Sequence, residues 1–420
     1  MDKMKVSRRN AIKKTAAGLT SLMIAPQFLR AAEAVKPFGE DYANLETLTT
    51  GEWWKRPGNL MTPLKNGRKA APPNLNIPRN QVVVFALYTH QNAVLKLTAQ
   101  LFPLKPGEPR QVRLELKFPK EEWKEVAQAE VLYPGWDAHF RIEEWDDSVD
   151  VKYRVRHGKG AKFEGLIRKD PRNKEEIVVA NLSCNSSRTT GPRKEIVDNL
   201  RKLNPDLLFF GGDQTYRHTE HTAGWIEFGL QYRDIIKDRP TIAIPDDHDV
   251  GHPNVWGENG KHSSIPGNAD GGYKFPVDYV NLVQRQQTWS LPDPVDPDPV
   301  NRNIGVYFTR LTVGKVDFAI LEDRKFKTGP AGKIPQMGPR PDHINDPSYD
   351  PRKIDLEGLE LLGPRQEKFL EEWTEDWTDS DMKCVLSQTA FCGAVHMHGS
   401  RNSRLLADLD CNGWPQTPSR

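Results

Sequence analysis

The sequence has few cysteines and no excess of charge of either sign, and both absences narrow its function. Only 4 of its 420 residues are cysteine, and none stands in a Cys-x-x-Cys pair. We therefore expect no disulfide framework of the kind that holds small secreted domains together. Lysine and arginine total 59 against 57 acidic residues. Such a balanced chain has no field that would attract nucleic acid or an acidic membrane surface.

The chain also lacks a hydrophobic run long enough to cross a bilayer, so we expect no membrane span in the mature protein. A shorter apolar run over residues 16–25 follows the pair Arg8-Arg9 and precedes small residues at 32–34. This order is typical of an export signal, and the residues around Arg8-Arg9 resemble the twin-arginine motif. We predict a signal peptide over residues 1–34, recognition by the twin-arginine export machinery, and a periplasmic or extracellular location. A plain amphipathic or anchored N-terminal helix is the alternative.

Three patterns divide the rest of the chain. Residues 35–80 are rich in proline, glycine and basic side chains, which indicates an extended lead-in segment. Residues 81–170 alternate polar and apolar side chains between turn residues, which predicts an antiparallel β-sandwich of the immunoglobulin or fibronectin kind. Residues 171–420 contain short apolar runs and helical patterns, which predict a layered α/β domain.

The predicted strands of the α/β domain are residues 177–182, 207–210, 241–244, 316–321 and 384–387. A helix is predicted over residues 192–203, where Ile196, Leu200 and Leu203 share a face. A second helix is predicted before the last strand, with Phe369, Leu370, Trp373 and Trp377 on its apolar face. Long stretches rich in proline or glycine, at about 251–276, 291–299 and 327–351, are expected to form the rim of a site.

Polar clusters stand where four of these runs end. They are Ser183-Cys184, the segment from Asp213 to Tyr216, the segment from Asp246 to Asp249, and Glu322-Asp323-Arg324. The carboxyl ends of strands in α/β sheets are where ligands gather, so we expect the clusters to converge.

The clusters carry the side chains that a two-metal hydrolytic site needs. A carboxylate must bridge the two ions, and Asp213 is the natural bridge because glycines precede it and leave room for close approach. Tyr216 can return to the same ion as a phenolate, and Asp247 offers an oxygen to the second ion. His248 is placed to protonate the leaving oxygen as a general acid. A hydroxide bridged by the two ions would then attack phosphorus in line.

These motifs, in this order, resemble those of PhoD-type alkaline phosphatases and phosphodiesterases of the metallophosphoesterase superfamily. The residues 361–367 and 385–391 are similar to later landmarks of that family. The resemblance implies a metallophosphoesterase-type α/β sandwich, with Cys184, Asp213 and Tyr216 on iron(III) and Asp247 on calcium or another divalent ion. It also implies that His248 is the acid and that Arg324 stabilises the phosphoryl oxygens.

The chain departs from the family pattern at two places. Glu322-Asp323 stands where the family usually has Asp-Thr, and the closing Gly-Asp-x-His motif is missing before the last residue, Arg420. We interpret the missing motif as a C-terminal truncation. His396 and His398 are candidate replacement ligands, but a His-x-His pair near glycine is more typical of a solvated loop.

Several nearby side chains have two interpretations each. His252 and Asn254 either line the substrate cleft or belong to a surface loop, and Arg324 is either a phosphate clamp or a structural ion pair. His218 and His221 are expected to support the ligands or to face solvent.

The sequence therefore favours a secreted, metal-dependent hydrolase of phosphomonoesters or phosphodiesters. A purple-acid-phosphatase-like enzyme is one alternative, although those enzymes carry a histidine in the first motif, where this chain has Ser183-Cys184. A catalytically incomplete surface protein, whose β-sandwich binds a polymer, is the other.

Overall fold

The computed structural model describes residues 36–57, 62–63, 69–185, 191–264, 270–389, 396–397, 404–405 and 407–408, and the structural statements below concern these residues. The predicted signal peptide and the side chains of His396 and His398 lie outside them. Among the described helices, none has the length and hydropathy that a membrane crossing requires.

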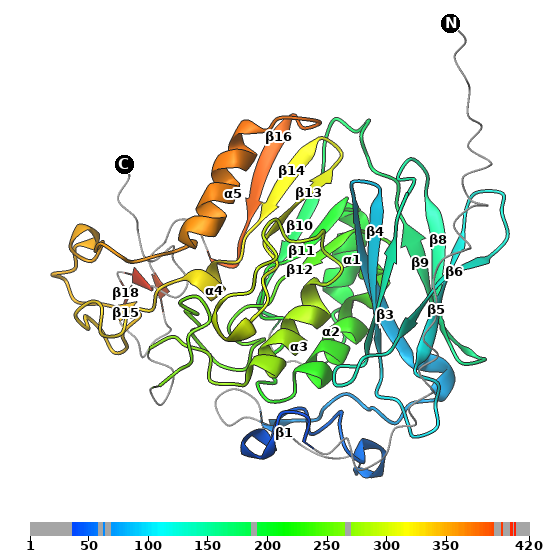
Figure 1. Cartoon of the computed structure of the whole chain (residues 1–420), viewed down its shortest axis with the longest axis horizontal. Coiled ribbons are helices and arrows are strands. Elements are labelled where there is room, and N and C mark those ends of the chain that lie inside the picture. The colour runs from blue at the N-terminus through cyan, green and yellow to red at the C-terminus, as the bar shows by residue number, and fades with distance from the viewer. Residues whose placement is uncertain are drawn as a thin grey trace, which may run out of the picture.

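The first half of the chain forms a sandwich of two antiparallel sheets, at the right of Figure 1. One sheet is β3-β4-β7 and the other is β6-β5-β8-β9. Their strands are β3 (Val83–Gln91), β4 (Val94–Leu101), β5 (Gln111–Lys117), β6 (Lys124–Glu130), β7 (Asp137–Ile142), β8 (Val151–His157) and β9 (Ala161–Ile167). Along β8, buried residues alternate with more exposed ones, because successive side chains of a strand point to opposite faces. The predicted antiparallel sandwich is confirmed.

The second half is built on two further sheets. Strands β10 (Val179–Leu182), β11 (Leu207–Phe210) and β12 (Thr241–Ala243) are parallel. Strand β14 (Val316–Ile320) pairs antiparallel with β13 (Thr309–Val313) and parallel with β16 (Met382–Leu386). Apolar side chains of both sheets, such as Phe209 and Phe318, share one core cluster. The polar clusters therefore come from two sheets, since the fourth follows β14.

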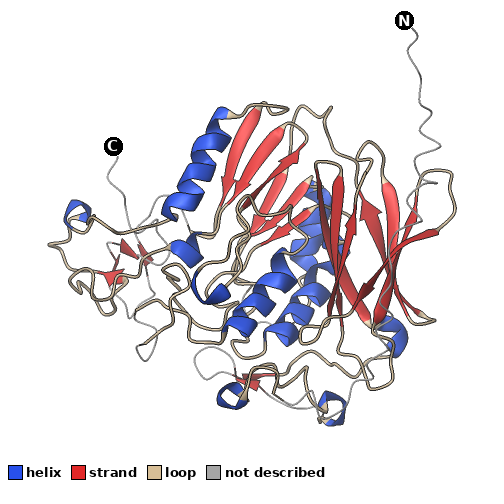
Figure 2. Cartoon of the chain, viewed as in Figure 1, coloured by secondary structure: helices blue, strands red, loops and turns tan. Residues whose placement is uncertain are grey.

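Helices cover the outer faces of this pair of sheets (Figure 2). They are α1 (Lys194–Leu203), α2 (His221–Ile236), α3 (Val277–Thr288), the short α4 (Asp323–Phe326) and α5 (Gly363–Glu375). Helix α2 packs between the parallel sheet and the β-sandwich, where Trp225 meets Phe85 edge to face with ring centroids 5.3 Å apart. On the other side, Trp373 of α5 donates a hydrogen bond from its indole N–H to Asp317 of β14 over 2.8 Å. The predicted layered α/β fold is confirmed.

Two details of the helix predictions are wrong. In α1 the buried side chains are Val197 and Leu200, whereas Ile196 and Leu203 are 40% and 63% exposed. The face of the helix that packs against the core is therefore different from the face predicted from the sequence. Trp377 lies beyond the end of α5 and is 54% exposed, because Asp376 leaves helical geometry and pairs with Arg310.

The short elements complete the described chain. They are β1 (Thr62–Pro63), β2 (Lys69–Ala70), β15 (His343–Ile344), β17 (His396–Met397), β18 (Arg404–Leu405) and β19 (Ala407–Asp408), with 3₁₀ turns at Glu40–Tyr42, Trp53–Lys55, Arg79–Gln81, Asn301–Asn303 and Pro351–Lys353. The segment before β1 packs against the start of α2. There the carboxylate of Glu46 accepts the backbone N–H of Thr222, and Glu220 accepts that of Leu48.

Candidate metal centre

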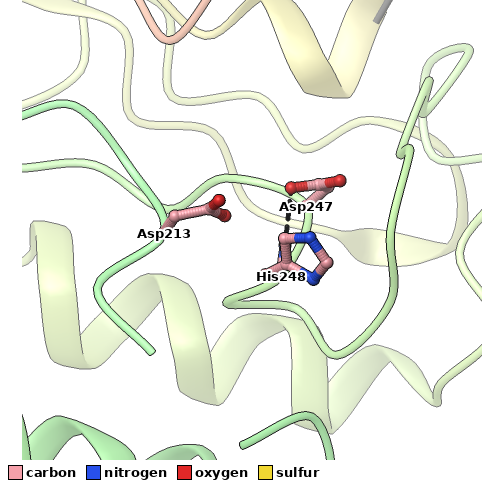
Figure 3. A group of neighbouring side chains, drawn as sticks. All are labelled: Asp213, Asp247 and His248. Atoms are coloured by element: carbon pink, nitrogen blue, oxygen red, sulfur yellow. Dashed lines mark hydrogen bonds between the residues drawn. The ribbon is translucent and has the colours of Figure 1, made fainter. Parts of the chain in front are cut away.

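Three acidic or histidine side chains meet at the carboxyl ends of β11 and β12. Asp213 follows β11, and Asp247 and His248 follow β12. Figure 3 shows the three side chains around one space. One potential ligand atom from each lies within 4.8 Å of the others, and all three residues are buried. The predicted convergence of these side chains is present in the structure.

The loop that carries Asp213 has an uncommon backbone. Gly212 has φ 104° and Asp213 has φ 59°, a left-handed conformation that side chains other than glycine seldom adopt. A Cβ atom on Gly212 would lie 2.4 Å from Cβ of Asp246, so only glycine lets these two strand ends approach so closely. This close approach brings the acids of the two loops together.

Asp249 connects the loop after β11 to the loop after β12 by hydrogen bonds. Its Oδ2 accepts the backbone N–H groups of Asp213 and Asp246 over 2.8 and 3.0 Å, and its Oδ1 accepts that of Thr215 over 3.0 Å. The residue is fully buried, and burial raises the pKa of its carboxyl to about 7. The sequence analysis gave Asp249 no role, although it lies in the same cluster as Asp247.

The carboxylate of Asp213 is surrounded by further donors of the kind that bind metals. Its Oδ2 accepts the hydroxyl of Tyr216 over 2.6 Å and lies 3.6 Å from Sγ of Cys184. Its Oδ1 is buried and has no hydrogen-bond partner among the described residues. Cys184, which follows β10, is a free and exposed thiol. The candidate ligands Cys184, Asp213 and Tyr216 therefore lie together.

This arrangement is electrostatically costly without a cation. Burial, followed by the charges of Asp247, Asp246 and Asp249, raises the pKa of Asp213 well above its usual range. Burial and the charge of Asp213 likewise raise the pKa of Tyr216. A buried carboxylate oxygen with no donor, among several acids, fits a positively charged ion, and a carboxylate, a thiolate and a phenolate are a suitable donor set for one.

Asp247 is fixed by the loop that follows it. Its Oδ1 accepts the backbone N–H of His248 over 2.7 Å, and its Oδ2 accepts that of Asn254. The side-chain amide of Asn254 donates to Oδ2 of Asp342 over 2.6 Å. The sequence analysis missed Asp342, which is buried within one of the long proline-rich and glycine-rich stretches and has no local signal there.

His248 belongs to a stack of aromatic rings. Its Nδ1 lies 2.7 Å from Nε2 of His218, and the two rings are stacked with centroids 4.9 Å apart. The ring of Tyr216 packs on His248 at 4.4 Å. His218 is thus a direct neighbour of His248. The hydroxyl of Tyr279 in α3 donates a hydrogen bond to the backbone carbonyl of His218 over 2.9 Å.

Arg324 reaches the same place from the second sheet. Its Nε lies 2.5 Å from Oδ1 of Asp246, and both side chains are almost fully buried. The adjacent Glu322 pairs with Lys325 instead, also in a buried position. The structural ion pair expected for Arg324 is therefore present. Its acidic partner, Asp246, directly precedes Asp247 in the sequence.

Two histidines near the centre are more deeply buried than the sequence suggested. His252 is fully buried, its backbone N–H donates to the carbonyl of Asp247 over 3.2 Å, and burial lowers the pKa of its ring well below the usual range. His221 begins α2 and is also fully buried, and burial lowers the pKa of its ring to about 3. A solvent-facing position for His221 is therefore wrong.

Comparison with known proteins identifies the fold. The sequence matches no protein-family model and no curated protein. The structure is similar to that of PhoD, with a TM-score of 0.59 and 15% sequence identity, over 80% of this chain and 67% of PhoD. A purple acid phosphatase from yellow lupin (Lupinus luteus) seeds gives a TM-score of 0.45 at 12% identity, over 74% of this chain and 51% of that protein. The chain therefore has a PhoD-like fold, with a group of buried candidate ligands at the ends of its strands.

Proposed function

We propose that this chain is a metal-dependent phosphoester hydrolase of the alkaline phosphatase D kind. The observation that carries the proposal is the buried Oδ1 of Asp213, which has no hydrogen-bond partner in the described part of the chain and lies in a group of acids, next to a thiol and a phenol. The fold supports it, because metallophosphoesterases use this architecture. Two ions at such a site supply an activated water and brace the oxygens of a phosphoryl group.

The ligands fall into two sets. Asp213 has two carboxylate oxygens and would be the residue that holds both ions. Cys184 and Tyr216 lie on its Oδ2 side and complete the first position, where the thiolate and phenolate favour iron(III). Asp247 serves the second position, for which calcium or another divalent ion is proposed.

Two residues, His248 and Arg324, act on the substrate in this proposal. His248 gives a proton to the leaving oxygen, and its stack with His218 and Tyr216 fixes the direction of its ring. Arg324 stabilises the phosphoryl oxygens from its place beside Asp246.

Asn254 and His252 act on the substrate site indirectly, through their contacts with Asp247. Both donate backbone N–H groups to Asp247, one to its carboxylate and one to its carbonyl. The side-chain amide of Asn254 is bound to Asp342 and the ring of His252 is buried, so we assign both residues to positioning Asp247 beside the substrate. Export by the twin-arginine route, to a periplasmic or extracellular location, completes the proposal.

The experiment combines metal analysis with turnover. The purified chain is loaded with iron and calcium, its metal content is measured by mass spectrometry, and hydrolysis of nitrophenyl phosphate and of bis-nitrophenyl phosphate is followed. We expect bound metal and turnover of at least one ester, both of which a chelator removes. A chain that binds no metal contradicts the proposal and favours the catalytically incomplete surface protein.

Two variants separate the roles of ligand and acid. Asp213→Ala is expected to lose metal, whereas His248→Ala is expected to keep metal and to lose turnover, most with poor leaving groups. The atoms of His248 lie close enough to Asp213 and Asp247 to share an ion with them. Equal loss of metal in both variants would therefore make His248 a ligand and contradict its role as the acid.

A further inference from the structure

A second polar cleft lies at the opposite ends of the strands from the metal centre. It is lined by the turn between β3 and β4, the turn between β13 and β14, and the segment between α5 and β16. Figure 1 shows these turns at the end of β14 and β16 that points away from α4. The cavity has a volume of about 580 Å³, within the roughly 300–1,000 Å³ of small-molecule sites.

The charges of the cleft disfavour an anionic ligand. Its lining includes 5 aspartates (Asp147, Asp170, Asp376, Asp379 and Asp381) and 3 basic residues (Arg172, Arg310 and Lys315). Arg172 pairs with Asp147 and Asp170 over 2.7 Å each, Arg310 with Asp376 over 2.7 Å, and Lys315 with Asp381 over 2.9 Å. Because each basic group is held by a carboxylate, a phosphate or carboxylate ligand would meet a net negative surface.

One wall of the cleft offers an aromatic ring. Trp377 is 54% exposed, and the ammonium of Lys383 lies 4.7 Å from its ring centroid. The same ammonium lies 4.8 Å from the ring of Trp373, so Lys383 fixes Trp377 from one side. The exposed part of the ring is an apolar platform on the wall of a polar cavity.

Groups that form hydrogen bonds surround this platform. Ser380 is only 8% exposed, and its hydroxyl has no hydrogen-bond partner among the described residues. Asn92 also lines the cleft, at an exposed position with φ 51° in the turn between β3 and β4. The carboxylates held by Arg172 and Arg310 are fixed acceptors.

We propose that this cleft binds a neutral saccharide. A pyranose ring has an apolar C–H face, which suits the ring of Trp377, and a rim of hydroxyl groups, which suits fixed carboxylates, an amide and a serine hydroxyl. The walls come from the β-sandwich and from the α/β domain, so a bound sugar contacts both. This binding site goes beyond phosphoester hydrolysis and does not depend on the metal centre.

The test measures binding of three trisaccharides, maltotriose, cellotriose and chitotriose, to the purified full chain by calorimetry. Phosphate and spermidine are the anionic and cationic comparison ligands. We expect at least one trisaccharide to bind, and Trp377→Ala to weaken that binding about tenfold or more, while Trp377→Phe retains most of it. Turnover of nitrophenyl phosphate should be the same in Trp377→Ala as in the unaltered chain.

The matched control is Trp123→Ala. Trp123 is a partly exposed tryptophan of the β-sandwich that also stacks on a cation, Arg154 at 4.3 Å, and it does not line the cleft. Asp379→Ala, on an exposed turn of the cleft, keeps the test decisive if Trp377→Ala does not fold. Absence of heat with every trisaccharide, binding of spermidine or phosphate alone, or equal losses in Trp377→Ala and Trp123→Ala overturns the proposal.

Discussion

The carboxylate of Asp249 gives the sharpest test of how the metal centre is assembled. It accepts three backbone N–H groups, from Asp213, Asp246 and Thr215, and so ties the loop after β11 to the loop after β12. Asp249→Asn has the same shape but replaces one oxygen by an amide that cannot accept. In either orientation of the amide, at least one of the three N–H groups loses its acceptor.

The size of the effect follows from that loss. A buried donor without a partner costs about 1–3 kcal/mol. If the two loops of the variant move apart, metal binding must bring them together again at this cost in free energy. The metal dissociation constant then rises about 5- to 150-fold. If the amide replaces Oδ2, Asp213 loses the bond that holds its backbone at φ 59°; if it replaces Oδ1, Thr215 in the same loop loses its acceptor.

The assay is competition for metal against a chromogenic chelator at pH 7, with circular dichroism to show that the variant folds. The matched control is Asp206→Asn. Asp206 is also buried and accepts a backbone N–H, that of Val178 over 3.1 Å, but it lies before β11, at the other end of the sheet. Equal metal affinity in Asp249→Asn and Asp206→Asn would refute the positioning role of Asp249.

Further predictions concern Tyr216, Arg324 and Glu220. Tyr216→Phe, loaded with iron(III), should lose the visible phenolate-to-iron absorption band, and an unchanged spectrum contradicts coordination by Tyr216. Arg324→Met removes the cation that pairs with the buried Asp246 and should cost about 3–5 kcal/mol in the free energy of unfolding, measured in urea, with most of it regained when Asp246→Asn is added. Burial and the charge of Glu46 raise the pKa of Glu220 from 4.5 to about 8, so the folded state holds a proton that the unfolded chain releases. The free energy of unfolding should therefore fall by up to about 1.4 kcal/mol per pH unit between pH 4.5 and 8, and Glu220→Gln should flatten that slope; equal slopes in both proteins contradict it.

The strands and the candidate ligands were predictable because their signals are local. A run such as residues 207–210 is apolar at every position since β11 is buried on both faces, and Asp213 follows it directly. Once strand ends are known, the side chains that follow them are expected to meet. The residues that converge on Asp213 were therefore found without any knowledge of long-range contacts.

Helix α2 escaped prediction because most of its residues are buried and its exposed stripe, around Glu227 and Asp234, is narrow. It also contains Gly229, where a Cβ atom would lie 2.1 Å from Cδ1 of Phe85. Glycine weakens a helical pattern in a sequence, but here it lets the helix approach the β-sandwich. Packing between two domains overrode the local preference.

The contacts that support the site could not be predicted, for a different reason. Asp342 binds Asn254 across 88 positions of sequence, and Arg324 binds Asp246 across 78. Neither partner lies in a pattern that points to the other. Such contacts depend on how two sheets and a long loop stack, which a single sequence does not encode locally.

The most direct test of the central claim is X-ray diffraction from crystals of the metal-loaded chain, with anomalous scattering recorded at the iron edge and above it. The account predicts two metal peaks that share the carboxylate of Asp213, one beside Cys184 and Tyr216 and the other beside Asp247. A map with no metal between Asp213 and Asp247, from protein that contains stoichiometric metal, would contradict it.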